Sequence, residues 1–159
     1  MKDSIKIGIV AGEHSGDILG ENLLKALKKI KNVEIFGVGG PKMEGQGLKS
    51  AFDFNNLNIM GLVDPILNYS KIMSYKNDLC DLFINEMIDV FIGIDSPDFN
   101  MQIQQRLKKI SKIKTVQLVT PSIWAWRKRR LKNIKKYTDL SVSLFKFEHD
   151  FYKKNGLNN

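Results

Sequence analysis

The sequence predicts an α/β protein whose parallel β-sheet is covered by helices on both faces. Two observations carry this prediction. Short runs rich in β-branched residues alternate along the chain with longer segments of helical periodicity, an alternation typical of parallel sheets. The clearest run, DVFIGI at residues 89–94, is apolar after its first residue, as expected of a strand with both faces buried.

Glycine, proline and polar residues mark the ends of the expected strands. The first strand, SIKIGIVA at residues 4–11, is followed by Gly12, and the second, at 33–38, ends in a Gly-Gly-Pro turn. Further strands are expected near 50–54 and at 89–94, 114–119 and 140–144.

The expected helices cover residues 17–31, 65–87, 97–110, 124–137 and 147–153. The first helix places Leu23, Leu27 and Ile30 on one face, and Ser15 is its candidate N-cap. Pro65 and Pro97 suit the first turns of the second and third helices, where the missing N–H costs nothing.

The composition fits one globular domain and excludes several classes of protein. The chain has 159 residues, 43% apolar and 26% charged, which is enough to bury a core and too apolar for a disordered chain. Cys80 is the only cysteine, which excludes a disulfide scaffold and, with two histidines, the usual zinc site. No uncharged apolar run reaches about 18 residues, so no spanning helix is expected. No secretory signal is visible, so a cytosolic setting is expected.

Positive charge is concentrated in the last third of the chain. Residues 105–159 hold 15 of the 25 Lys and Arg but only 3 of the 17 Asp and Glu. The densest segment is RKRRLKNIKK at residues 127–136. It is either a solvated helix face or a surface that attracts polyanions, such as ligand phosphates, anionic lipid headgroups or nucleic acid.

Four loops follow the carboxyl ends of expected strands, where open α/β sheets bind ligands. They cover residues 12–17, 39–42, 95–98 and 120–127. The first is not a dinucleotide fingerprint, because glycines lie at positions 12, 16 and 20, and it is not a Walker loop. It suits an anion or hydroxyl groups bound at a helix N-terminus. The alternative is a tight turn in which Ser15 and Asp17 cap the helix.

Asp95 directly follows the most apolar strand. A carboxylate there suits a general base that takes the proton of a substrate hydroxyl. The alternative is a helix cap, which the Asp-x-Pro-Asp spacing also suits. A magnesium site would need a third ligand beside Asp95 and Asp98, and none is evident, so no metal is expected.

Loop 120–127 holds two tryptophans separated by one residue, so they do not share a helix face. Trp124 and Trp126 pack either against a sugar or acyl chain or into the core. Arg127, which follows them, suits a phosphate.

The helix expected at 65–87 has an apolar edge beside Lys71 and Lys76. This edge is either buried against the sheet or faces lipid. Its members are Val63, Ile66, Tyr69, Ile72 and Met73.

Six strings, in this order, resemble motifs of the lipid-A-disaccharide synthases. They are VAGEHSGD (10–17), GVGGPKM (37–43), IMG (59–61), VFIGIDSPDFN (90–100), TPSIWAWR (120–127) and FEHDFY (147–152). They are distributed over essentially the whole chain, which is identified on them as a member of that family. His14 stands where the family often has a small residue, and no role is carried onto it.

The resemblance implies the N-terminal half of a GT-B glycosyltransferase, a Rossmann-like domain. The family transfers 2,3-diacylglucosamine from UDP to 2,3-diacylglucosamine 1-phosphate (lipid X), with inversion and without a metal or cofactor. The products are the β-1,6-linked lipid A disaccharide 1-phosphate and UDP. Asp95 is the implied catalytic base. The implied substrate-binding residues are Gly12, Glu13, Ser15, Gly16, Asp17, Asp98, Ser122, Trp124, Trp126 and Arg127.

Family members are more than twice this length, so residues 1–159 are expected to be a single, acceptor-side domain. The C-terminal domain that binds the nucleotide sugar is expected to be absent, or to come from a separate chain, and the chain alone is expected to be inactive. The alternative function is a non-catalytic module that binds the acceptor lipid or an anion.

The resemblance also implies the surroundings of the protein. The family works in the cytoplasm at the surface of the inner membrane, so peripheral association through the apolar edge at 63–73 is expected. Nucleic-acid binding would explain segment 127–136 but none of the loops, and no nucleic-acid partner is expected. A related sugar-nucleotide enzyme, such as an epimerase, would not need the paired tryptophans.

Overall fold

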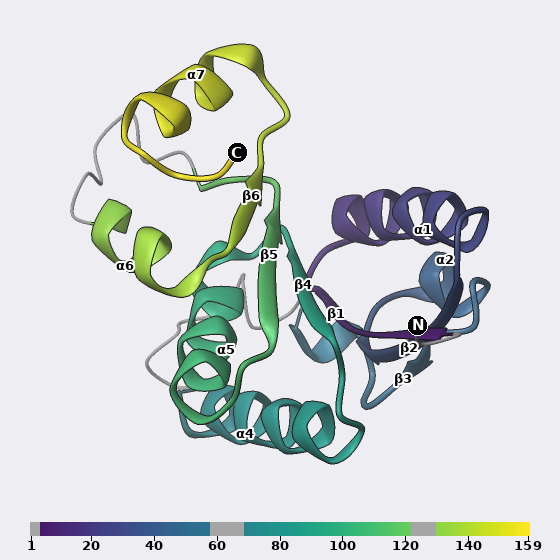
Figure 1. Cartoon of the computed structure of the whole chain (residues 1–159). Coiled ribbons are helices and arrows are strands. Elements are labelled where there is room, and N and C mark those ends of the chain that lie inside the picture. Colours follow the sequence, from purple (N-terminus) through teal and green to yellow (C-terminus); the bar gives the residue numbers. More distant parts are fainter. Residues whose placement is uncertain (1–3, 58–68, 122–129) are drawn as a thin grey trace.

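The computed structural model describes residues 4–57, 69–121 and 130–159. In these ranges six strands form one sheet in the order β3-β2-β1-β4-β5-β6 (Figure 1). The strands are β1 (Ser4–Ala11), β2 (Asn32–Val38), β3 (Lys49–Ser50), β4 (Val90–Ile94), β5 (Lys114–Leu118) and β6 (Leu140–Val142). All neighbours pair in parallel. This is the strand order of a Rossmann-like sheet, so the predicted fold class is confirmed.

Helices connect these strands and lie on both sides of the sheet (Figure 1). They are α1 (His14–Lys28), α2 (Pro41–Glu44), α4 (Tyr69–Asn85), α5 (Pro97–Ile110), α6 (Arg130–Tyr137) and α7 (Lys146–Lys154). The bounds predicted for α5 are confirmed, because Pro97 begins it as expected.

The core has one layer on each face of the sheet, because successive residues of a strand point to opposite faces. Ile7 and Ile9 of β1 belong to the layer that contains Leu24 of α1. Val10, the residue after Ile9, belongs to the layer on the opposite face, which contains Phe83 of α4. Each such fully buried side chain contributes about 1.5–3 kcal/mol. A smaller cluster of Ile134, Tyr152 and Leu157 joins α6 and α7, and Met101 of α5 packs against it.

Several element bounds differ from those predicted. β3 has two residues, and the chain bends directly after it, where the Ser50 hydroxyl donates to the carbonyl of Phe52 at 2.9 Å. β6 has three residues, ending at Val142. α1 begins three residues earlier than expected, and α2 was not expected. The parts of the expected helices at 65–68 and 124–129 lie outside the described residues.

β1 and β4 lie side by side at the centre of the sheet, with Ala11 paired to Ile94 at their carboxyl ends. The chain leaves β1 toward β2 on one side and leaves β4 toward β5 on the other. The loops after these two strands therefore begin next to each other, at the switch point where sheets of this type bind ligands. Within residues 4–57, 69–121 and 130–159, no helix combines the length with the apolar character that a membrane span requires.

Candidate functional site

The loops that follow β1 and β4 contact each other at the carboxyl edge of the sheet. Ser15 Oγ donates a hydrogen bond to Asp95 Oδ2 at 3.3 Å. Gly12 lies under Ser96, and a Cβ at Gly12 would be only 2.3 Å from Ser96 Oγ. The glycine therefore lets the two loops approach. Three predicted site residues, Gly12, Ser15 and Asp95, are brought together here.

Asp95 has a left-handed backbone, with φ of 53°, and so does Ser96, with φ of 38°. The Asp95 N–H donates to the carbonyl of Leu118 at 3.1 Å, which ties the turn to β5. The side chain of Ser96, the N-cap of α5, makes no capping bond. The described hydrogen bond of the Asp95 carboxylate is to Ser15 in the first loop. It is not a capping bond to the start of α5.

Backbone strain is concentrated at this edge. Val119, directly after β5, has φ of 66°. A left-handed conformation is unusual for residues other than glycine, and for a β-branched residue it is an outlier. Strained residues of this kind persist where the surrounding structure holds them, and they cluster at functional sites.

The start of α1 differs from the prediction. Its N-cap is Glu13, with no side-chain capping bond, so the predicted N-cap role of Ser15 is wrong. Ser15 instead lies in the first turn, where it, Glu13 and His14 are exposed. Gly16 is buried, and a Cβ there would be 3.3 Å from the Cβ of Ala11. The His14 ring lies edge-on to Phe54, with 5.3 Å between ring centroids.

Asp17 joins α1 to α2. Its carboxylate accepts the backbone N–H groups of Lys42 and Met43, each at 3.0 Å. The side chain is 2% exposed, and a Cβ at Gly40 would be 2.6 Å from its Oδ2. A carboxylate at a helix N-terminus stabilises the helix, so the described bonds give Asp17 a structural role. A contact between Asp17 and substrate stays a prediction.

Asp98 lies in the first turn of α5, and its carboxylate forms an ion pair with Arg130 of α6. Sequence reasoning singled out Arg127 and missed Arg130. The one signal in the sequence was the basic segment at 127–136, which contains Arg130. Lys132, Lys135 and Lys136 of the same helix are exposed.

Pro121 is the second residue of the fourth loop, and its carbonyl accepts a hydrogen bond from the buried hydroxyl of Tyr152 at 2.9 Å. Burial raises the pKa of Tyr152 above its usual value. Tyr152 thus anchors the start of the loop, a role that the sequence did not indicate. Ser122, Trp124, Trp126 and Arg127 lie outside the described residues.

The predicted lipid-facing edge is described in part. Val63 and Ile66 lie outside the described residues. Tyr69 is 63% exposed, whereas Ile72 and Met73 are half-buried. Among the residues described, no three His, Cys, Asp or Glu side chains lie close enough to hold a metal ion.

Comparison with known proteins identifies the family. The family model described as lipid-A-disaccharide synthetase matches residues 7–159. The chain belongs to this family. The matched range contains both loops of the candidate site, so the contact between Ser15 and Asp95 lies within the family's domain.

Curated members of the lipid-A-disaccharide synthetase family are similar over almost the whole chain. The lipid-A-disaccharide synthase of Pseudoalteromonas translucida is 48% identical over 94% of this chain and 39% of its own length. The synthase of Idiomarina loihiensis is 46% identical over 96% of the chain and 40% of its own length. Lipid-A-disaccharide synthase 2 of Legionella pneumophila is 44% identical over 99% of the chain and 41% of its own length. The chain thus spans about two fifths of the length of these relatives.

Proposed function

We propose that this chain is the acceptor-side domain of a lipid-A-disaccharide synthase. The reaction transfers 2,3-diacylglucosamine from UDP to 2,3-diacylglucosamine 1-phosphate, forming a β-1,6 linkage and releasing UDP. Family membership supports the reaction. The observation that carries the site is the left-handed Asp95 at the switch point, with its carboxylate 3.3 Å from the Ser15 hydroxyl.

Asp95 acts as the general base. Its carboxylate takes the proton of the acceptor hydroxyl as that oxygen bonds to the anomeric carbon of the donor sugar. The bond from this carbon to the UDP oxygen breaks at the same time, and attack opposite the leaving group inverts the anomeric centre. The step needs no metal ion. Ser15 orients the carboxylate through its hydrogen bond.

The other residues bind and orient the acceptor. Backbone N–H groups at the start of α1, from Gly12 to Gly16, suit hydroxyl or phosphate oxygens. Arg130 fixes Asp98 beside this region through their ion pair. Arg127 binds a phosphate, and Ser122, Trp124 and Trp126 line the sugar or acyl chains.

The protein works in the cytoplasm, bound peripherally to the inner membrane. Tyr69 is exposed at the start of α4, with the half-buried Ile72 and Met73 in the next turn. Lys71 and Lys76, close to this edge, suit anionic lipid headgroups. Val63 and Ile66 complete the lipid-facing edge.

A second candidate function is a module that binds the acceptor lipid without catalysis. The chain spans about two fifths of the length of its relatives, and in the enzyme we propose, a second domain holds the nucleotide-sugar site. Residues 1–159 alone are then inactive, and a chain without that domain would be a module that binds the acceptor lipid.

The two candidates are separated by a disaccharide assay with radiolabelled lipid X and UDP-2,3-diacylglucosamine. The chain is assayed alone and with a separately expressed segment of the Pseudoalteromonas translucida relative that lies outside the matched region. Asp95→Asn is compared with Asp150→Asn, which removes an exposed carboxylate on α7 that pairs with Lys146.

We expect activity only in the mixture, lost in Asp95→Asn and kept in Asp150→Asn. Saturable binding of lipid X without disaccharide formation in any mixture would favour the binding module. Equal activity of the two variants would remove Asp95 from the role of base.

A further inference from the structure

Behind Asp95 lies a set of amide side chains that are almost fully buried. Asn100, Gln104 and Gln117 are 0%, 0% and 1% exposed. Asn100 and Gln104 lie on α5 and Gln117 on β5. Buried amides are costly unless they are hydrogen-bonded, so their partners show what the set holds in place.

Most of these amide donors are directed to the backbone around Asp95. The carbonyl of Asp95 accepts hydrogen bonds from Asn100 Nδ2 at 2.8 Å and Gln117 Nε2 at 3.1 Å. Gln117 Nε2 also lies 3.3 Å from the carbonyl of Leu118 and 3.2 Å from that of Val119. One amide group thus contacts both strained turns, the one after β4 and the one after β5.

The orientation of Gln117 is itself fixed. Its Oε1 accepts a hydrogen bond from Gln104 Nε2 at 3.0 Å, and Gln104 Oε1 accepts one from the hydroxyl of Thr138. Three carbonyl oxygens surround the Gln117 Nε2 position, and because carbonyl oxygens only accept hydrogen bonds, the NH₂ group and not the oxygen of the amide must lie there. Gly93 leaves room for the set, since a Cβ at this position would be 2.7 Å from Asn100 and 2.9 Å from Gln117 Oε1.

The turn at Asp95 needs such support. A left-handed residue other than glycine costs about 1–2 kcal/mol, and Asp95 and Ser96 are two in succession. The Asp95 carbonyl accepts hydrogen bonds and the Asp95 N–H donates one, so the peptide units on both sides of its Cα are held in place. The orientation of these two peptide units sets the direction in which the side chain extends from the backbone.

We propose that Gln117, together with Asn100, is a positioning residue for Asp95. Gln117 is 1% exposed, so in this proposal it acts through Asp95 and not on the substrate. It holds the Asp95 turn so that the carboxylate stays beside Ser15 and faces the acceptor hydroxyl. The catalytic part of this inference rests on the proposed role of Asp95 as base, whereas the hold on the turn does not.

The first experiment measures the hold on the turn in the 159-residue chain. Amide hydrogen exchange is followed at Asp95 by NMR in wild type, Gln117→Leu and Gln117→Glu. Gln117→Glu keeps the size and the acceptor for Gln104 but loses the amide donor. Thr115→Val is the matched control, because Thr115 is equally buried but bonds to Tyr137 and Asp139 at the other edge of the sheet.

We expect exchange at Asp95 to be at least about tenfold faster in both Gln117 variants and unchanged in Thr115→Val, because only the former lose donors to the turn. Unchanged exchange in the Gln117 variants, or equal acceleration in Thr115→Val, would overturn the proposal.

The second experiment measures catalysis in a full-length chimaera, in which residues 7–159 replace the matching segment of the Pseudoalteromonas translucida relative. We expect Gln117→Leu to lower kcat at least about tenfold with little change in KM, since a misplaced base affects the chemical step. Thr115→Val keeps its kcat although it lowers Tm. A kcat for Gln117→Leu within twofold of wild type would contradict the positioning role.

The two proposals fail in different ways. Activity retained in the Asp95→Asn chimaera would remove the proposed catalytic role of Asp95, and with it the catalytic role of Gln117. Loss of activity in Asp95→Asn with normal kcat in Gln117→Leu would leave the proposed function standing and remove only the positioning role.

Discussion

Asp89 and Asp139 each precede a strand at the amino edge of the sheet, and each turns its carboxylate back onto the neighbouring strand. Asp89 Oδ2 accepts the N–H of Lys6 on β1 at 3.0 Å, and the Asp89 N–H donates to the carbonyl of Lys6. Asp139 Oδ2 accepts the N–H of Thr115 on β5 at 2.7 Å, and the Asp139 N–H donates to that residue's carbonyl. Each aspartate thus makes two hydrogen bonds to one residue of the neighbouring strand, which extends the hydrogen bonding of the sheet by one residue before the strand begins.

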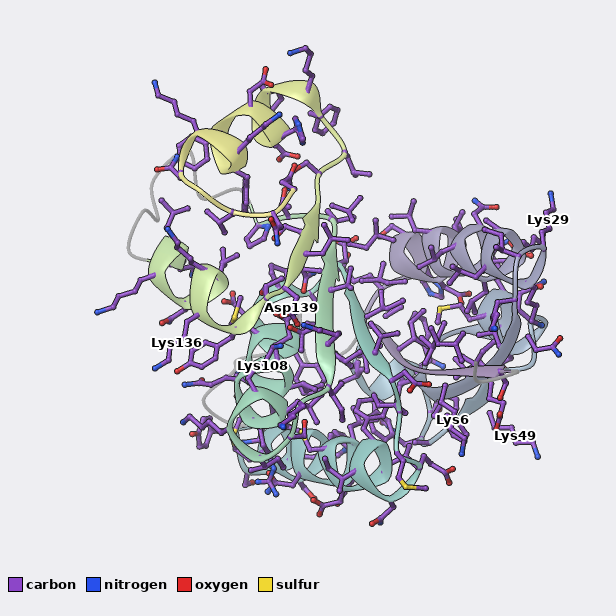
Figure 2. All side chains as sticks on the ribbon, in the orientation of Figure 1. Lys6, Lys29, Lys49, Lys108, Lys136 and Asp139 are labelled. Carbon is purple, nitrogen blue, oxygen red and sulfur yellow. The ribbon has the colours of Figure 1, made fainter. Side chains whose placement is uncertain are left out.

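At the carboxyl edge, Asp95 follows a strand and is arranged in the opposite way. Its backbone is held by Asn100, Gln117 and Leu118, whereas its carboxylate is bonded to the exposed Ser15 hydroxyl. At the amino edge, Asp139 also forms an ion pair with Lys108 of α5 (Figure 2). The same residue type therefore binds backbone N–H groups at one edge, whereas at the other edge its carboxylate is bonded to an exposed hydroxyl, and we propose that this carboxylate is the general base.

The sharpest test of this comparison is Asp95→Asn in the full-length chimaera. We expect disaccharide formation to fall by about 10²–10⁴-fold, the usual contribution of a general base. Tm should change little because the backbone bonds of Asp95 remain. Activity is measured with radiolabelled acceptor and stability by thermal unfolding. A large loss of Tm would instead place Asp95 with the structural aspartates.

Asp139→Asn is the reciprocal change at the amino edge. We expect the free energy of unfolding to fall by about 2 kcal/mol, since hydrogen bonds to a charged group are lost and Lys108 is left without its partner. The kcat of the chimaera should not change. The free energy of unfolding is measured by urea unfolding at neutral pH. A loss of kcat above tenfold would contradict a purely structural role for the aspartates of the amino edge.

The same variant changes the pH dependence of stability. Burial alone would raise the pKa of Asp139, but the hydrogen bonds from Lys108 and Thr115 outweigh it, so the pKa lies below the usual value. A lowered folded-state pKa contributes stability above the unfolded-state pKa, and this contribution is lost as pH falls through the folded-state value. We expect wild type to lose more stability than Asp139→Asn between about pH 5 and pH 2. Parallel curves for the two proteins would refute this.

Ser96→Gly tests the strain at the carboxyl edge. Glycine adopts the left-handed region without the cost that serine bears there, so we expect the free energy of unfolding to rise by about 1 kcal/mol. Ser74→Gly, on the exposed face of α4, is the matched control and should lower stability by about 0.5–1 kcal/mol. Destabilisation by both substitutions would show that the Asp95–Ser96 turn is not strained.

The smallest effect is expected from Lys6→Met. Lys6 Nζ lies 3.9 Å from carboxylate oxygens of both Glu34 and Glu86, in partly exposed ion pairs, and ion pairs near the surface contribute about 0–1 kcal/mol. The loss should shrink further as salt is raised from 0.05 to about 0.5 M, because salt screens such pairs. A loss as large as that of Asp139→Asn would mean that exposed ion pairs, and not the bonds of aspartates to the backbone, stabilise the amino edge.

The sheet was predictable because its information is local. Apolar runs bounded by glycine and proline placed the central strands, and Pro97 marked the start of α5. The proximity of Asp95 to the first loop was predictable, because the carboxyl ends of neighbouring strands meet. α2 was not predictable, since its N-terminus depends on Asp17, 24 residues before Pro41 begins it.

The remaining features depend on tertiary contacts that no local pattern shows. No glycine marks the left-handed turn at Asp95 and Ser96, which is held by amides from α5 and β5. The ion pair of Asp98 with Arg130 required the position of α6 relative to α5. Side chains that hold a backbone from a distance are invisible to periodicity.

The outer side of β6 bears on how this protein behaves at high concentration. β6 is the last strand of the described sheet, and the carbonyl of Asn158 accepts the N–H of Ser141, its central residue, at 2.9 Å. Unpaired strand edges are templates for pairing between molecules. Because the carbonyl of Asn158 occupies the N–H of Ser141, this group is not available for pairing with a strand of another molecule.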